Sequence, residues 1–290
     1  MNLLGIIEEI SKADPEFEDR INPRRAAIKN ITSFGSKVAV AALPFAFSTL
    51  FKKAYGQTAT PSVNDVLNYA LKLEYLEAAF YNAGVASTLA FSSTEKAYLV
   101  SIQGHENAHV AFLKSVLGAN AVAQTTQGTN GAYDFTGGYN TTTNTVTGTG
   151  PFTTVLTSVD TYLAVAQAFE DTGVRAYKGQ AGNLLGNQVV LTAALNIHSV
   201  EARHAAAVRE LRRKRGASTT KPWISGANDT GITAVNDNYK GEDNVIQGGV
   251  DITTLSAVSG STSTRIATEA FDEALSMTEV VNLVKIFGVK

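Results

Sequence analysis

Apolar residues recur at the three- and four-residue spacing of an amphipathic helix in four segments after residue 60. Ser62, followed by Asp65 three residues later, begins the first segment, and Ser92 with Glu95 forms a capping box at the second. The segments run over about residues 62–84, 92–118, 158–179 and 187–215. Four helices of this length are typical of a helical bundle, so the sequence predicts an all-α fold.

A long polar link, residues 119–157, separates the second and third predicted helices and is rich in Gly, Thr and Asn. Such a link is unusual inside a compact domain. It is explained if the two helices are parallel, because the chain must then travel the length of the bundle, about 30 Å for 20 residues. We therefore expect a four-helix bundle over residues 58–216, with residues 119–157 as its crossover loop.

The composition changes again after the fourth predicted helix, and residues 217–265 are rich in Ser, Thr, Gly and Asn. A last short helix is capped by Ser276, with Glu279 three residues on. Its apolar face consists of Val280, Val281, Val284 and Phe287. No part of this tail has enough apolar periodicity for a core of its own. We expect residues 217–290 to form a C-terminal extension packed on the bundle.

The N-terminal region, residues 1–57, resembles a twin-arginine export signal. Arg24 and Arg25 precede an apolar run at residues 38–51, which is shorter than the roughly 20 residues that span a bilayer. We therefore expect export, to the periplasm or the outside, without a stable membrane anchor. Two features depart from the pattern: Ala27 replaces an aromatic residue, and the region before the arginines is acidic. The alternative is an amphipathic helix on the bundle of a cytoplasmic protein.

Charge and cysteine content narrow the classes of partner. A net charge of −2 gives no reason to expect nucleic acid or an anionic membrane as a partner. The basic run at residues 212–215 ends the fourth predicted helix, where it complements the helix dipole. The chain has no cysteine, which excludes thiolate zinc sites, iron–sulfur clusters and disulfides.

The second and fourth predicted helices each contain a Glu-x-x-His motif, Glu106 with His109 and Glu201 with His204. Residues three apart lie on one helical face, so the carboxylate can bridge two ions while the imidazole binds one. The first and third helices contribute Glu74 and Glu170 within apolar stripes. Four carboxylates in one bundle core are tolerable only if cations neutralise them, since a buried unpaired carboxylate costs several kcal/mol.

The two halves of this ligand set repeat each other. Glu74 is followed by Tyr81 and Glu170 by Tyr177 at the same spacing, and each Glu precedes its Glu-x-x-His motif by 32 or 31 residues. A lone Glu-x-x-His is a weak signal, whereas two at matched spacing are a strong one. Glu from two helices and Glu-x-x-His from the other two is the ligand pattern of carboxylate-bridged dinuclear bundles. The oxygen-rich, sulfur-free set indicates two iron or two manganese ions, with iron slightly favoured.

These motifs resemble those of the ferritin-like superfamily, which includes bacterioferritins and rubrerythrins. Residues 65–81 and 270–275 are more closely similar to exported ferritin-like domain proteins related to plant desiccation-related proteins. The similarity covers roughly residues 60–290. It implies the four-helix bundle and, where the ligands are present, a dinuclear site.

Alternatives remain at several positions. Glu77 competes with Glu74 as the ligand of the first helix, although the spacing to Tyr81 favours Glu74. Tyr81 and Tyr177 are the candidate catalytic residues, which could donate to ligand carboxylates or shuttle electrons; the alternative is ordinary packing with one satisfied hydroxyl.

The two remaining histidines, His105 and His198, lie close to the motifs in sequence. Either could orient a metal ligand, but an ordinary surface or core histidine is the favoured interpretation. Asp171, beside Glu170, is expected off the ligand face.

Two functional hypotheses follow. The first is a redox activity of the dinuclear site with oxygen or a peroxide, of ferroxidase, peroxidase or catalase type. The second is an exported structural or stress-protective protein whose metal site is structural or vestigial. Whether the chain is an enzyme is therefore open. The expected partners are metal ions and a small oxidant, and the sequence also allows a homo-oligomer.

Overall fold

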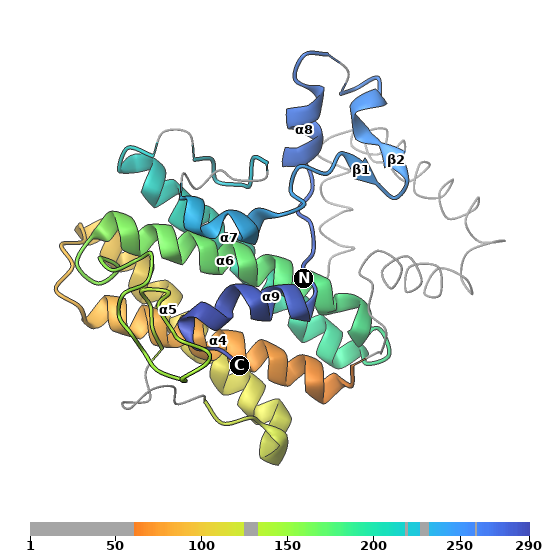
Figure 1. Ribbon diagram of the computed structural model, residues 1–290. Helices are drawn as coiled ribbons and strands as arrows, with labels where there is room; N and C mark the ends of the chain where they lie inside the picture. The colour runs from red at the N-terminus through yellow and green to blue at the C-terminus, as the bar shows by residue number, and fades with distance from the viewer. Residues whose placement is uncertain (1–60, 125–132, 218–219, 227–231, 259) are drawn as a thin grey trace, which may run out of the picture. The chain divides into compact units, whose positions relative to one another are not determined.

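The computed structural model describes residues 61–124, 133–217, 220–226, 232–258 and 260–290 (Figure 1). The export signal predicted for residues 1–57 lies outside these residues. Within the described part of the chain, no helix is long and apolar enough to cross a membrane.

Four long helices form the core of the fold and confirm the predicted all-α bundle. They are α4 (Val63–Ala86), α5 (Ser93–Leu117), α6 (Val159–Ala181) and α7 (Gln188–Lys214). Helix α4 packs along α5, and α6 packs along α7 (Figure 1). The N-caps are Ser62, Ser92, Ser158 and Asn187, whose side chains each accept a hydrogen bond from the backbone three residues on.

The first and third predicted helices end at Gly84 and Gly179, but in the structure both glycines lie inside helices. Helix α4 continues two residues beyond Gly84, and α6 continues two beyond Gly179. A Cβ atom at Gly84 would lie 2.2 Å from the Tyr162 ring, and one at Gly179 would lie 1.9 Å from the carbonyl oxygen of Leu275. These glycines therefore permit close packing.

Helices α5 and α6 run in the same direction, so the chain between them must cross the bundle. Helices α4 and α6 are antiparallel, because Tyr81 contacts Glu170 while Tyr177 contacts Glu74. The described crossover contains the short helix η1 (Gly118–Asn120) and a single β-bridge.

The crossover is held by hydrogen bonds within itself and by hydrogen bonds to the C-terminal segment. The side chain of Asp134 accepts hydrogen bonds from the backbone of Thr136, Thr147 and Gly148. The backbone N–H of Asp134 donates to Phe287, and that of Tyr139 donates to Ile286, at 3.0 and 2.9 Å.

The C-terminal residues form more secondary structure than the sequence indicates. After η2 (Gly182–Leu184), which precedes α7, the elements are η3 (Thr233–Tyr239), β1 (Ile246–Gln247), β2 (Val250–Asp251), η4 (Ile252–Thr254), α8 (Ser263–Glu269), α9 (Met277–Val284) and η5 (Lys285–Phe287). Strands β1 and β2 pair antiparallel. The predicted last helix is α9, capped by Ser276, and its buried Val280 and Val284 join the apolar core of the bundle.

A buried arginine on α7 joins two long helices to the C-terminal residues. The Nε and Nη2 atoms of Arg209 donate to the two carboxylate oxygens of Asp171 on α6, at 2.9 and 2.6 Å. Its Nη1 donates to the carbonyl oxygens of Lys221 and Trp223. The Tyr239 hydroxyl also donates to Asp171, at 2.6 Å. Asp171 therefore has a structural partner and points away from the ligand groups.

A second buried arginine, Arg175 on α6, binds further along the C-terminal residues. Its Nε donates to the carbonyl oxygen of Glu273 at 2.7 Å and lies 2.8 Å from the Glu242 carboxylate. Its Nη2 donates to the Lys240 carbonyl at 2.6 Å. One guanidinium thus satisfies backbone carbonyls from two separate stretches of the chain.

Replacing Asp171 by Ala tests the Arg209 network. The variant leaves a guanidinium buried without its carboxylate, so we expect a loss of about 3–5 kcal/mol in the free energy of unfolding, measured by urea titration. Glu210→Ala, which removes the exposed partner of Arg213, is the control and should cost less than about 1 kcal/mol. Equal losses in the two variants would contradict this assignment.

Candidate metal centre

The six predicted ligand residues come together between the four helices in two overlapping groups. One group consists of Glu74, Glu106, Glu201 and His109, and the other of Glu106, Glu170, Glu201 and His204. Within each group the potential ligand atoms all lie within 4.8 Å of one another. Because Glu106 and Glu201 belong to both groups, the arrangement offers two cation positions joined by two carboxylates.

The first position lies at the His109 imidazole. Its Nδ1 atom is 3.2 Å from Glu74 Oε2, from Glu106 Oε2 and from Glu201 Oε1. Three carboxylates, from three different helices, therefore face one imidazole nitrogen of α5.

The second position lies at the His204 imidazole. Its Nδ1 atom is 2.9 Å from Glu106 Oε1, 3.3 Å from Glu170 Oε2 and 3.8 Å from Glu201 Oε2. Glu106 and Glu201 thus present one oxygen to His109 and the other to His204. This division of oxygens is what a bridging carboxylate requires.

The buried polar atoms of these groups would be better satisfied by metal ions than they are by hydrogen bonds to one another. The carboxylates of Glu74, Glu106, Glu170 and Glu201 are fully buried. Both oxygens of Glu201, Oε1 of Glu106, Oε2 of Glu170 and Nδ1 of His204 have no partner in hydrogen-bonding geometry among the described residues, despite the short distances. Buried polar atoms are rarely left without partners. Two cations would satisfy all of these atoms with oxygen and imidazole ligands of the type that iron and manganese accept.

The charges at the centre depend strongly on one another. Burial raises the pKa of Glu106 well above its usual value and raises that of Glu170 to about 8. Burial also opposes ionisation of Glu201, yet the adjacent His109 and His204 lower its pKa to about 2. Burial disfavours charging of both imidazoles, but the surrounding carboxylates raise their pKa to about 12. Protons therefore supply positive charge without metal, and binding a cation must displace them.

The two predicted tyrosines bind the terminal carboxylates in a reciprocal manner. Tyr81 of α4 donates its hydroxyl to Glu170 Oε1 on α6, and Tyr177 of α6 donates to Glu74 Oε1 on α4. Each terminal carboxylate therefore has one oxygen on a phenol and the other facing the cation position.

His105 contacts the site, although the sequence favours an ordinary histidine there. Its Nδ1 atom is 2.9 Å from Nε2 of His204, and the two rings stack with centroids 5.1 Å apart. A partner on the outer nitrogen orients a ligand imidazole. The sequence signal that could have predicted this contact was the position of His105 one helical turn before His109. His198 belongs to neither ligand group, and burial lowers its pKa.

Glu77, the alternative to Glu74, is buried but lies outside both ligand groups. Its Oε1 and Glu201 Oε2 would each lie 3.4 Å from a Cβ atom at Gly173, so the absence of a side chain there leaves room for both carboxylates. Burial, together with the Glu201 carboxylate, raises the pKa of Glu77 well above its usual value.

A surface opening leads to the histidine side of the centre. It has a volume of about 350 Å³ and lies between α5 and α7. Its lining includes Ile102, His105, His109, Val200, Arg203 and His204. A small molecule can therefore approach both ligand imidazoles from solvent.

Comparison with known proteins agrees with the fold and with the ligand cluster. A family model described as a ferritin-like domain matches residues 62–214, which is more than half of the chain. The chain therefore belongs to the ferritin-like domain family. Comparisons with curated proteins and with solved structures found no significant match. The family membership and the buried cluster together indicate metal binding.

Replacing Tyr177 by Phe tests the reciprocal tyrosine contacts. The change leaves Glu74 Oε1 buried without this donor, so we expect the metal-free protein to lose about 1–3 kcal/mol of stability in urea unfolding. The control is Tyr98→Phe, because Tyr98 is 48% exposed; it should change stability by no more than about 0.5 kcal/mol. A loss in Tyr177→Phe no larger than that of the control would show that the hydrogen bond contributes nothing.

Proposed function

We propose that this chain holds two iron or two manganese ions, with iron slightly favoured, and that the centre reacts with oxygen or a peroxide. The observation that carries the proposal is the division of carboxylate oxygens, in which Glu106 and Glu201 each face both His109 and His204. Glu74 and Glu170 complete the two positions. When bound, ions of this kind would supply the electrons that reduce oxygen or a peroxide, and in a catalase-type reaction they would also accept electrons from a second peroxide.

The residues of the chain position the centre and control access to it. Glu106 and Glu201 hold the two positions at a fixed separation, because each carboxylate faces both. Tyr81 and Tyr177 fix the terminal carboxylates through one oxygen each. His105 orients the imidazole of His204. We propose that the opening between α5 and α7 admits the oxidant to this side of the centre.

A structural or stress-protective role is the second candidate, and one observation favours it. The ligand residues come from all four helices, so bound ions would link the whole bundle. An ion that binds only the folded state stabilises it by mass action. In this second candidate function, the metal rigidifies the protein without turnover.

Metal content and turnover test the two candidates together. The full-length protein, loaded anaerobically with ferrous or manganous ions and desalted, should retain about two ions per chain by elemental analysis. The Glu106→Ala/His204→Ala variant should lose both, because it removes a bridging carboxylate and an imidazole. The control, His198→Ala/Glu210→Ala, changes the same residue types outside the ligand groups and should retain both ions.

Rates of ferrous oxidation by oxygen and of peroxide consumption then separate the candidates. Turnover in the wild type and the control, lost in Glu106→Ala/His204→Ala, supports the redox function. Bound ions that raise the melting temperature without turnover support the structural role. A wild-type protein that retains no ions after loading contradicts the redox function and the stabilising role of a metal, and leaves a structural protein with a vestigial site.

We also propose that the protein is exported through the twin-arginine route, on the basis of residues 1–57 alone. The route carries folded proteins, which agrees with a buried centre that could be loaded before transport. In a bacterial host with this route, Arg24→Lys/Arg25→Lys should retain the full-length chain in the cytoplasm, as measured by cell fractionation and immunoblotting. Lys52→Arg/Lys53→Arg, a charge-conserving change after the apolar run, is the control. Equal export of both variants would disprove the proposal.

A further inference from the structure

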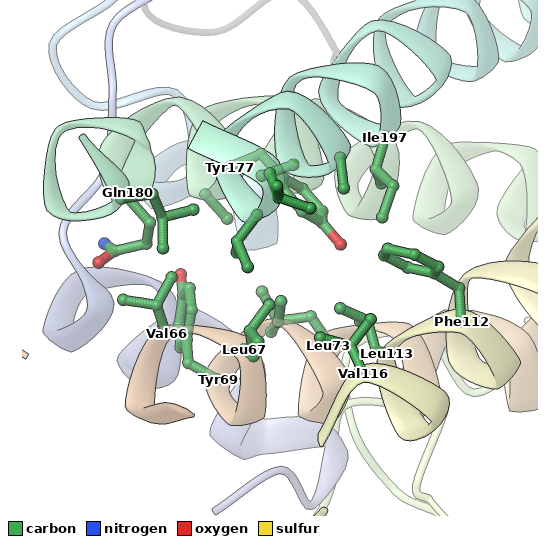
Figure 2. A pocket seen from close by; sticks show the side chains of 17 residues that line it. Val66, Leu67, Tyr69, Leu73, Phe112, Leu113, Val116, Tyr177, Gln180 and Ile197 are labelled. Atoms are coloured by element: carbon green, nitrogen blue, oxygen red, sulfur yellow. The ribbon is translucent and has the colours of Figure 1, made fainter. Parts of the chain in front are cut away.

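A second cavity lies in the bundle, apart from the ligand groups. It has a volume of about 150 Å³ and is bounded by side chains of all four long helices (Figure 2). We call it the inner cavity; its walls include Leu67, Leu73, Leu113, Tyr177, Val190 and Ile197. No ligand carboxylate or ligand imidazole lines it. Well-packed interiors keep few voids larger than a water molecule, so a cavity of this volume is a candidate binding site for a small molecule.

The inner cavity reaches the surface between α5 and α7. Phe112, Val116 and Val189 belong to its lining and are 40%, 45% and 81% exposed. Apolar side chains at the entrance allow an apolar molecule to enter without desolvating charged groups.

Two buried polar groups lie in the otherwise apolar wall. The hydroxyl of Tyr69 and the side-chain nitrogen of Gln180 are buried and have no hydrogen-bond partner among the described residues. The other amide atom of Gln180, its oxygen, accepts a hydrogen bond from Asn183 at 2.9 Å, which leaves the nitrogen as the free donor. Figure 2 shows both side chains at one side of the inner cavity, with Phe112 and Ile197 at the other. Each unsatisfied group costs about 1–3 kcal/mol.

We propose that the inner cavity binds a small, largely apolar molecule that carries one neutral acceptor oxygen, such as a ketone or an aldehyde. A carbonyl oxygen has two lone pairs and can accept from both Tyr69 and Gln180. A carboxylate is disfavoured, because no Lys, Arg or His among the residues that the structure describes lines the cavity to balance its charge. A cavity of this volume holds a molecule of about benzene size.

The inner cavity shares one residue with the metal centre. The side chain of Tyr177 lines the cavity, while its hydroxyl donates to Glu74 Oε1. A molecule in the cavity would therefore contact Tyr177 and not the ligand residues. This inference goes beyond the proposed function and stands whether or not the centre is redox-active.

A matched pair of probes tests the role of the two donors. The probes are 2-pentanone and 2-methyl-1-pentene, which have as many non-hydrogen atoms as benzene and differ only in the replacement of the carbonyl oxygen by a methylene group. Their dissociation constants for the full-length protein are measured by ligand-observed NMR titration. In Tyr69→Phe/Gln180→Met we expect the ketone to bind about tenfold more weakly, as loss of its hydrogen bonds implies. Binding of the alkene should be unchanged.

A second variant tests the location. Ala194→Phe places a ring in the inner cavity and should abolish binding of both probes, whereas Ala97→Phe, at an exposed position of α5, should bind both normally. If Ala194→Phe does not fold, the donor variant decides, because it keeps the side-chain volumes nearly constant. Neither variant alters a ligand residue, so metal content separates failure here from failure of the proposed metal centre.

Three results would overturn the proposal. They are no binding of either probe to the wild type, equal ketone affinity in the wild type and the donor variant, or binding of both probes to a folded Ala194→Phe.

Discussion

The burial of four carboxylates between four helices is the constraint on which the rest of the structure depends. Glu74, Glu106, Glu170 and Glu201 are fully buried, and a bundle cannot keep such groups ionised without positive charge beside them. Two imidazoles supply positive charge, two phenol hydroxyls donate hydrogen bonds, and the cluster is able to hold metal ions. Most of these partners come from a different helix, so the electrostatics of the centre hold the helix pairs in register.

The C-terminal residues meet a different requirement. They bring backbone carbonyls to Arg175 and Arg209, two guanidinium groups that would otherwise be buried without enough acceptors. Both arginines lie on α6 or α7, and the aromatic and aliphatic side chains of α9 and η5 join the same apolar core. Most of α6 is thereby buried, whereas much of the surface of α5 stays exposed.

Much of the fold could be predicted because its signals are local. The caps at Ser62, Ser92 and Ser276, and the helical spacing between them, depend only on neighbouring residues. The ligand set could also be assembled from the sequence, because two repeated motifs leave few alternatives. Gly84 and Gly179 were misleading, since a glycine that ends a helix and one that admits a neighbour look alike. The β1–β2 hairpin and α8 lack an apolar pattern in the sequence. The His105 contact depends on a partner distant in sequence, His204.

The hydrogen bonds between the crossover and the C-terminal segment have a consequence for the order of folding. Asp134 and Tyr139 pair with Phe287 and Ile286, roughly 150 residues later in the chain, whereas α4 and α5 are neighbours in sequence. Contacts that close so long a loop form late. During synthesis the four helices can therefore assemble before the crossover has its partner. The crossover reaches its final conformation only when the end of the extension docks, which makes this contact the last step in completing the fold.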